Sequence, residues 1–365
     1  PSKYTEFSVK NSPWKDGKGD IVKEVSEACR EEGLKFGVYL SPWDVHEETY
    51  GTPAYNDYFC NQLTELCSNY GELFCVWFDG ACRTADKVQG YEWDRYYSLI
   101  RKLQPNACIS ICGPDVRWIG NEAGESREEE WSVVPKSIMV TERNPGYWRQ
   151  LDTMPNSTWK DIGSRDFIKD YDELIWYPAE VDVSIRPSWG YVEGEEKQLY
   201  SLETLLYMYE KAVGGNATLL LNVPPNKEGL FDLEDVERLA ELGKAIRGLF
   251  SRPQTTGAKA FQKNRSNAEA ILDADRTHFV ELAGECQEIE IQLQGEHTID
   301  FIVLKETIEK GQRVEKFAVD IQDTWTVTDL RSMISLIALG LAFGLAGRCF
   351  SVLLQKAKKL FGEKI

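Results

Sequence analysis

Over the first 250 residues, segments in which hydrophobic residues recur at helical spacing take turns with short runs of consecutive hydrophobic residues. Segments with apolar residues at helical spacing are followed by short apolar runs, the order expected of a parallel α/β sheet or barrel. The first helical segment, 20–32, is apolar at Ile21, Val22, Val25 and Ala28, and Gly33 ends it. The same pattern predicts helices over 20–32, 55–68, 93–103, 202–213 and 234–250.

The short apolar runs predict the strands of this region. They cover 34–40, 73–78, 107–112, 181–187 and 217–223, and a shorter apolar segment lies at 137–141. That makes about five or six strands, whereas a closed (β/α)8 barrel needs eight. The predicted fold class is therefore α/β, with a partial TIM-like barrel over residues 1–252 that lacks its first strands.

The pattern changes after Pro253. Residues 287–294 alternate Ile289, Ile291 and Leu293 with polar residues, the period of a half-buried antiparallel strand. With 278–282 and 299–304, this predicts a β-sandwich domain over 253–322. The domain is incomplete, because about 70 residues are few for a sandwich.

A third region, 323–365, has yet another character. It holds an apolar run over 333–347, then Arg348, and a Lys-rich end. The run is shorter than the roughly 20 apolar residues of a membrane span. The tail is either an anchoring helix that contacts a membrane or a sequence that has left its proper reading frame, and we favour the second.

Composition narrows the function classes. The formal net charge of −17 argues against nucleic acid and anionic membranes as partners. The nine cysteines form no C-x-x-C pair, and Cys75 and Cys108 lie in strand-like runs, which predicts buried free thiols. The three histidines are not at ligand spacing, so the sequence predicts no zinc site.

One strand ends in a carboxylate. The apolar run 73–78 is followed by Asp79 and Gly80. At the carboxyl end of a barrel strand an acid is placed for catalysis, although Asp79 could instead cap the following turn. A retaining glycosidase pairs such a nucleophile with a second carboxyl group as acid/base.

Three residues are candidates for that second carboxyl group. Glu122 lies between Gly120 and Gly124, which let the backbone approach a ligand closely. Glu130 precedes Trp131, and Glu180 precedes a predicted strand and is interpreted as structural. A solvated loop acid remains the alternative for Glu122.

Several motifs together resemble the α-L-fucosidases of glycoside hydrolase family 29 over about residues 1–320. They are Pro1-Ser2-Lys3-Tyr4-Thr5-Glu6-Phe7-Ser8, Lys18-Gly19-Asp20, Tyr39-Leu40-Ser41-Pro42-Trp43, Trp77-Phe78-Asp79-Gly80 and Leu221-Asn222-Val223-Pro224-Pro225. The resemblance implies a retaining exo-fucosidase with Asp79 as nucleophile. The loop 117–122 resembles the α-1,3/1,4-fucosidase subfamily, which implies Glu122 as acid/base and a fucosylated oligosaccharide as substrate.

The resemblance also suggests residues that bind the sugar. Ser184-Ile185-Arg186-Pro187-Ser188-Trp189 resembles a family strand end near the sugar, and Trp43, Trp77 and Trp189 could pack on its apolar face. Arg117 and Arg186 could bind ring hydroxyls, with a surface ion pair as the alternative for each. The full predicted substrate-binding set is Trp43, Trp77, Arg117, Trp118, Glu130, Trp131, Arg186 and Trp189.

The chain also departs from the family. The family's sugar-binding histidines lie on opening strands that would precede Pro1, and His46 does not match them. We therefore expect an N-terminally truncated chain: either an active fucosidase, or an inactive fragment that at most binds carbohydrate or another partner. A barrel glycosidase for another sugar is a third alternative. The parent protein is expected to be periplasmic or secreted, and the compartment of this chain stays open.

Overall fold

The computed structural model describes most of the chain up to residue 320. The described residues are 1–79, 87–143, 155–262, 266–272, 275, 277–282, 288–295, 297–299, 301–307, 311–312, 314, 317–320 and 335–338. The chain divides into two compact units. Unit 1 comprises Pro1–Gly120 and Val133–Glu180, and unit 2 comprises Asn121–Ser132 and Val181–Ile365.

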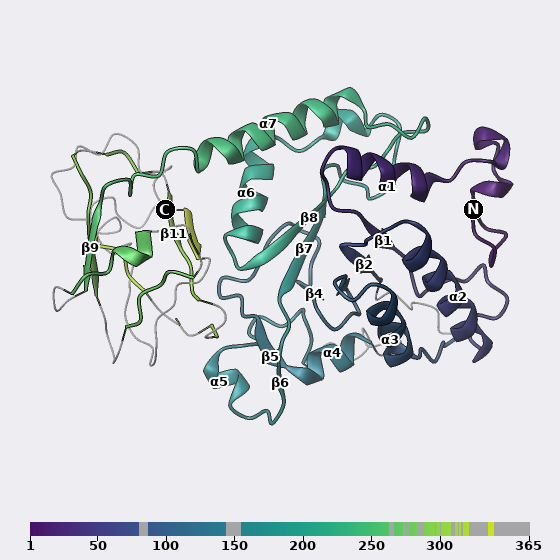
Figure 1. Cartoon of the computed structure of the whole chain (residues 1–365), viewed down its shortest axis with the longest axis horizontal. Helices are drawn as coiled ribbons and strands as arrows, with labels where there is room; N and C mark the ends of the chain where they lie inside the picture. The colour runs from purple at the N-terminus through teal and green to yellow at the C-terminus, as the bar shows by residue number, and fades with distance from the viewer. Residues whose placement is uncertain are drawn as a thin grey trace. The chain divides into compact units, whose positions relative to one another are not determined.

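Unit 1 contains a parallel three-stranded sheet in the order β1-β2-β3 (Figure 1). The strands are β1 (Gly37–Tyr39), β2 (Cys75–Trp77) and β3 (Cys108–Ser110). Tyr39 pairs with Trp77, and Trp77 pairs with Ser110, so the carboxyl ends of all three strands lie at one edge. The apolar runs that predicted these strands are longer than the paired segments.

Three helices accompany this sheet in unit 1: α1 (Ile21–Glu31), α2 (Ala54–Asn69) and α3 (Trp93–Leu103). All three confirm predicted helices. Asp20 caps α1 by accepting a hydrogen bond from the Lys23 amide. The apolar sides of α2 and α3 pack with the sheet in one core, which holds Val38, Tyr55, Phe59, Leu63, Val76, Phe78, Tyr96, Ile100 and Ile109.

The rest of unit 1 is made of short elements. They are η1 (Val9–Asn11), η2 (Trp14–Gly17), β4 (Arg117–Trp118), β5 (Val133–Pro135), α4 (Lys136–Glu142), α5 (Arg165–Ile168) and β6 (Leu174–Trp176). The prediction that counted 137–141 among the strands is wrong, because this segment is the helix α4. A short apolar run does not distinguish a strand from a buried helical turn. Here Ile138 packs with Val134 and Tyr177.

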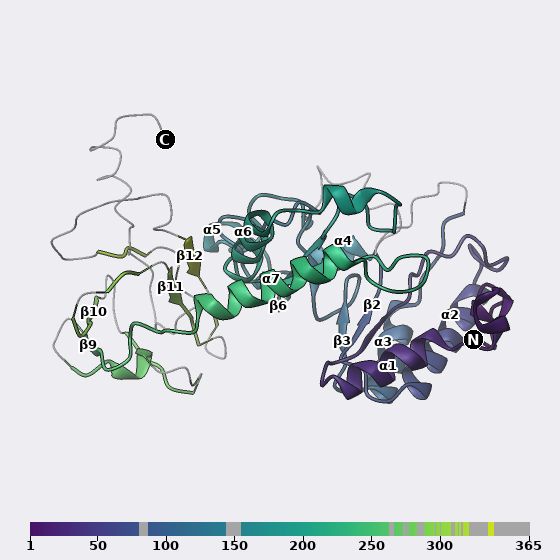
Figure 2. The same cartoon turned by 90° about the horizontal axis from the view of Figure 1, so that it is seen from above.

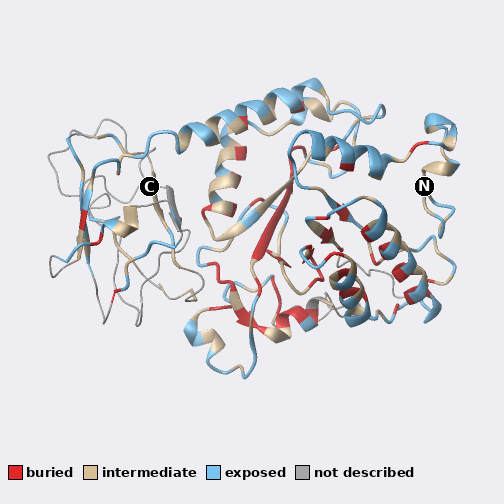
Figure 3. Cartoon of the chain, in the orientation of Figure 1, coloured by how far each residue is buried: buried red, intermediate tan, exposed pale blue. Residues whose placement is uncertain are grey.

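The boundary between the units falls within β7 (Ala179–Ser184), which is buried along its whole length (Figure 3). In unit 1, β4 pairs parallel to β7. In unit 2, β7 lies next to β8 (Ala217–Asn222). Helices α6 (Leu202–Val213) and α7 (Leu233–Leu249) confirm two predicted helices, and α7 lies one residue earlier than predicted (Figure 2). Leu205, Met208 and Leu242 lie in the core that these two helices share. The short η4 (Glu195–Gln198) precedes α6.

The strands after residue 252 only partly follow the predicted pattern. β9 (Lys259–Gln262) pairs antiparallel with β10 (Ile289–Gln292), and η5 (Glu269–Leu272) lies between them in the chain. Ile291 is 43% exposed, so the predicted half-buried alternation is incomplete. Residues 278–282 form no strand, and β11 (Phe301–Leu304) pairs parallel with β12 (Ser335–Ala338). The boundaries at 252 and 322 stay predictions.

Two further predictions concern thiols and the tail. The six cysteines in the described ranges are free, but Cys75 and Cys108 are half-buried rather than buried. Apart from 335–338, the tail from 323 on lies outside the described residues. Among those residues, no helix has the length and apolar character that crossing a membrane requires.

Candidate functional site

The Asp79 carboxylate stands just beyond β2 and is held by the neighbouring strand. Tyr39 is the last residue of β1, and its hydroxyl donates a 2.9 Å hydrogen bond to Asp79 Oδ2. The Tyr39 ring stacks on Trp77, with centroids 5.3 Å apart. Desolvation of the phenol and the Asp79 charge raise the pKa of Tyr39 to about 12, so Tyr39 remains a donor at neutral pH. Asp79 itself is half-buried.

Trp77 connects this group to a second acid. Its indole Nε1 donates a 2.6 Å hydrogen bond to Glu180 Oε1. Glu180 lies in β7 and is buried. Trp77 is half-buried. Its ring stacks on Tyr39, and its indole N–H donates to Glu180. This contact is consistent with the structural role that the sequence predicted for Glu180.

Trp43 lies in the loop after β1. It is half-buried and packs against the core of unit 1. Its backbone amide donates to Ser41 Oγ at 3.1 Å, and its buried indole Nε1 has no hydrogen-bond partner among the described residues. His46, a few residues later, is exposed, with its ring 5.0 Å from Phe7.

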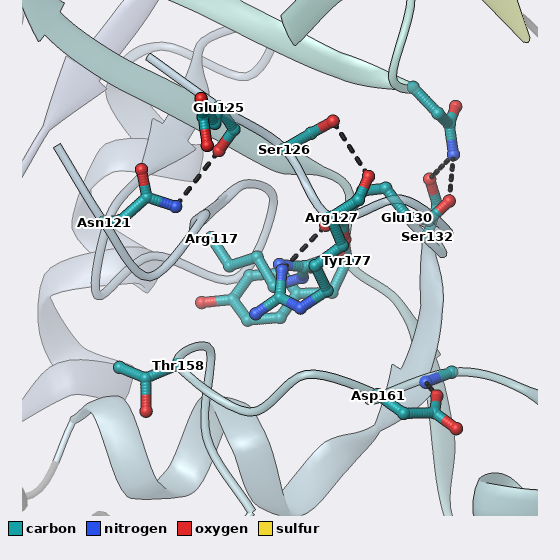
Figure 4. Close-up of polar contacts among 12 residues, drawn as sticks. Arg117, Asn121, Glu125, Ser126, Arg127, Glu130, Ser132, Thr158, Asp161 and Tyr177 are labelled. Carbon is teal, nitrogen blue, oxygen red and sulfur yellow. Dashed lines mark hydrogen bonds and ion pairs between the residues drawn. The ribbon is translucent and has the colours of Figure 1, made fainter. Parts of the chain in front are cut away.

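Arg117, in β4, is fully buried. Its Nε donates to the Tyr177 carbonyl oxygen at 2.9 Å (Figure 4). The alternative of a surface ion pair is therefore wrong for this residue. Trp118 follows in the same strand and is half-buried. Whether either residue binds substrate stays a prediction.

The Glu122 loop belongs to unit 2 and is held by its own polar contacts. Asn121 Nδ2 donates to the Glu125 carbonyl oxygen at 3.0 Å (Figure 4), and the Ala123 amide donates to Asn121 Oδ1. Gly124 has φ +78° and is buried. Glu122 is exposed, and its Oε2 accepts a 3.0 Å hydrogen bond from the Trp189 indole. Trp189 is 40% exposed.

Glu130 and Trp131 lie deeper in the same segment. Both are buried, and Glu130 Oε2 forms a 2.7 Å ion pair with Arg127. The Glu130 carbonyl oxygen accepts from Asn216. A buried acid with a fixed cationic partner fits a structural role. Substrate contact for Glu130 and Trp131 stays a prediction.

Arg186 follows β7 and binds two acids at the start of α7. Its Nη2 lies 2.6 Å from Asp235 Oδ2 and 2.8 Å from Asp232 Oδ2, and its Nε donates to Asp235 Oδ1. The Arg186 and Asp235 side chains are both fully buried. The alternative of a surface ion pair is therefore wrong for Arg186 as well, because the pair is internal.

Sequence reasoning missed two residues that organise these groups. No role was predicted for Tyr39, although its place at the end of the strand beside the Asp79 strand was a usable signal. Asn222, at the end of β8, donates to the Trp189 carbonyl oxygen at 2.8 Å. As for metals, the described residues contain no group of three or more His, Cys, Asp or Glu arranged to hold an ion.

Comparison with known proteins finds relatives of similar sequence. The model of the alpha-L-fucosidase family matches residues 1–176 and 165–247. Alpha-L-fucosidase 1 of Arabidopsis thaliana is 36% identical over 338 residues, which are 89% of this chain. The chain spans only 62% of the length of that relative.

Solved structures are similar as well. A glycoside hydrolase 29 family member from an unknown rumen bacterium is 41% identical, with a TM-score of 0.59 over 71% of this chain and 46% of that chain. A Ruminococcus gnavus GH29 fucosidase, solved in complex with fucose, is 28% identical, with a TM-score of 0.63 over 76% of this chain and 60% of its own. The family match covers well over half of the sequence, and the chain belongs to the alpha-L-fucosidase family.

Proposed function

We propose that this chain carries the catalytic residues of a retaining exo-α-L-fucosidase that hydrolyses terminal α-1,3/1,4-linked fucose in glycans. The observation that carries the proposal is the Asp79 carboxylate beyond a parallel strand, held at 2.9 Å by the Tyr39 hydroxyl. Family membership supports fucose as the sugar, and a relative from Ruminococcus gnavus has been solved with fucose bound.

The proposed reaction has two steps. Asp79 attacks the anomeric carbon of fucose while Glu122 gives its proton to the departing glycosidic oxygen, which leaves a fucosyl ester on Asp79. Glu122, now ionised, takes a proton from water as that water attacks the same carbon. Fucose leaves with retained configuration, and both carboxyl groups return to their starting states. The reaction needs no metal or organic cofactor.

Aromatic side chains are the proposed sugar contacts. Trp43, Trp77 and Trp189 offer apolar surfaces for the ring and methyl group of fucose. Arg117 and Arg186 are buried and bound to protein groups, which favours a supporting role for them over direct contact with hydroxyls.

The same proposal includes the architecture. We take residues 1–252 as a barrel-type catalytic domain of the (β/α)8 kind, 253–322 as a β-sandwich domain and 323–365 as a tail. The parallel β1-β2-β3 sheet with its helices supports the first part. The antiparallel pair β9–β10 supports the second.

Covalent trapping tests the proposal most directly. A 2-fluoro fucosyl fluoride should form an ester on Asp79, seen by mass spectrometry of the intact chain and of its peptides. Asp79→Asn should abolish both the adduct and release of fucose from a Lewis-type trisaccharide, lowering the rate by about 10³-fold or more. An adduct on another residue, or a first-formed product of inverted configuration, would contradict the mechanism.

One observation favours a second candidate function, carbohydrate binding without turnover. Among the strands of the described residues, β1 lies at the edge of its sheet, and Tyr39 at its end is 56% exposed. If the site binds sugar but does not complete the reaction, a fucosylated glycan will bind in calorimetry with no adduct and no fucose released. Asp79→Asn would then leave the measured affinity about the same.

A further inference from the structure

We propose that Trp189 is a positioning residue for Glu122, and this inference rests on the proposed function of Glu122 as acid/base. The indole Nε1 lies 3.0 Å from Glu122 Oε2. An exposed glutamate otherwise samples many rotamers, whereas an acid catalyst must point at one oxygen of the substrate. A fixed donor on one of its two oxygens removes that freedom.

The Trp189 backbone is itself held in place. Asn222 Nδ2 donates to the Trp189 carbonyl oxygen at 2.8 Å and to Ser184 Oγ at 3.0 Å. Ser184 Oγ in turn donates to the Ser188 carbonyl oxygen at 2.9 Å. These hydrogen bonds connect the loop that carries Trp189 to the ends of β7 and β8. They fix the backbone from which the indole extends.

The backbone around Glu122 is held as well. The Tyr207 hydroxyl of α6 donates to Glu125 Oε1 at 3.0 Å, and Ser126 Oγ donates to the Lys211 carbonyl oxygen at 2.7 Å. Gly124 packs so closely on α6 that an added Cβ would lie 2.6 Å from Met208 Cγ. With both backbones fixed, the Glu122 side chain is the part that still needs orientation.

The chemistry of an indole decides what the contact does. An indole N–H can only donate, so it bonds to Oε2 whether Glu122 is protonated or ionised. The carbonyl oxygen of a carboxylic acid is a better acceptor than its hydroxyl oxygen, so the contact favours the acid form with its proton on Oε1. Trp189 thus assigns Oε1 to proton transfer in both steps of the proposed reaction, and Glu122 returns to the same orientation after each turnover.

A spectroscopic measurement tests the contact without requiring turnover. In ¹⁵N-labelled full-length chain, Trp189→Phe identifies the Trp189 indole resonance. We expect Glu122→Ala to shift that resonance, because the indole loses its acceptor. The indole of Trp176, which is 44% exposed and lies in unit 1, should stay where it is. An unmoved Trp189 resonance would overturn the proposal.

Kinetics test the consequence. Trp189→Phe should lower kcat about tenfold for a Lewis-type trisaccharide, whose leaving group needs the acid, with KM little changed. Phenylalanine keeps an aromatic face for the sugar, so any loss through the sugar should be equal on both substrates. The loss on 4-nitrophenyl fucoside, whose leaving group does not need the acid, should therefore be the smaller of the two. Trp176→Phe is the matched control and should affect neither substrate. In a Glu122→Ala background, Trp189→Phe should not lower kcat further, because the side chain that it orients is absent.

The outcomes separate the two proposals. Equal losses on both substrates, or a further loss in the Glu122→Ala background, would mean that Trp189 acts through the sugar or the fold and not through Glu122. If even the unsubstituted chain releases no fucose, the proposed function fails. In that case only the NMR measurement tests the contact between Trp189 and Glu122. A shifted Trp189 resonance supports the contact, and an unmoved resonance overturns it.

Discussion

The Tyr39 hydroxyl donates a hydrogen bond to the Asp79 carboxylate across two neighbouring parallel strands. The register that pairs Tyr39 with Trp77 puts the phenol beside the residue that follows β2 by two positions. Because the Tyr39 ring also stacks on Trp77, the hydroxyl has one well-defined direction. The strand that flanks Asp79 therefore orients it.

Removing this hydroxyl should slow catalysis. Tyr39→Phe takes one hydrogen bond from a charged acceptor, a contact of about 1.5–3 kcal/mol, and we expect kcat on 4-nitrophenyl fucoside to fall at least tenfold. KM should change less, since the ring remains. Tyr70→Phe is the control, because Tyr70 also donates to an aspartate, Asp20, at the start of α1. A loss of similar size in both variants would point to the fold and not to Asp79.

Replacing the proposed acid/base should give a rate that an external nucleophile restores. Glu122→Ala removes both the proton donor and the base, so hydrolysis of a glycan should fall about 10²–10⁴-fold. Azide needs no base and should attack the fucosyl ester on Asp79, raising the rate on 4-nitrophenyl fucoside and giving fucosyl azide. Glu129→Ala changes an exposed acid of the same segment and should leave the rates unchanged. Absence of azide rescue would argue against Glu122.

Local signals in the sequence predicted the helices well. α3 and α6 have the predicted bounds, and α1 differs by one residue at each end, because side chains such as Asp20 and Ser201 cap them locally. α4 was not predicted as a helix, because its apolar run is too short to show a period. Strand ends were less accurate because pairing with a neighbour defines them.

The site could be predicted only as separate residues. Asp79 and Glu122 were identified from motifs, but their bonds to Tyr39 and Trp189 depend on strand register and loop packing. The burial of Arg186 was beyond local reasoning as well, since its partner Asp235 lies 49 residues further along the chain. Charged residues are normally exposed, so the sequence suggested contact with the sugar or a surface ion pair, and not an internal pair.

The Arg186–Asp235 pair should be important for stability. Asp235→Asn would leave a buried guanidinium without its closest charge partner, and we expect unfolding free energy to fall by about 3–5 kcal/mol in urea titration. Glu193→Gln removes an acid from the exposed pair with Lys227 and should lower the unfolding free energy far less, because solvent screens exposed ion pairs. Equal effects of the two changes would contradict this view of the buried pair.

Stability should also depend on acid pH through Asp232. Hydrogen bonds from Arg186 and Asn226 hold the pKa of Asp232 below its ordinary value of 3.8. A carboxylate whose pKa is lower in the folded state stabilises the fold above its unfolded pKa, and that stabilisation is lost as the pH falls through the folded pKa. Urea midpoints should therefore drop below about pH 4, and Asp232→Asn should reduce the drop. An unchanged pH dependence in that variant would exclude Asp232 as a cause.

A pair of glycines separates backbone strain from crowding near Glu122. Gly124 and Gly229 have nearly the same φ, +78° and +79°. An alanine at either position should therefore lower the unfolding free energy by about 1–2 kcal/mol through backbone strain. An added Cβ at Gly229 meets nothing within 4 Å, whereas at Gly124 it would lie 2.6 Å from Met208 Cγ. Gly124→Ala should therefore cost about 1–3 kcal/mol more than Gly229→Ala in urea titration.

Gly124→Ala should in addition lower fucose release, because the crowding displaces the backbone two residues from Glu122. The additional Met208→Ala substitution opens space beside the new methyl group and should recover part of that activity. Equal stability of Gly124→Ala and Gly229→Ala would mean that α6 moves aside easily. The loop would then not be held as closely as the orientation of Glu122 requires.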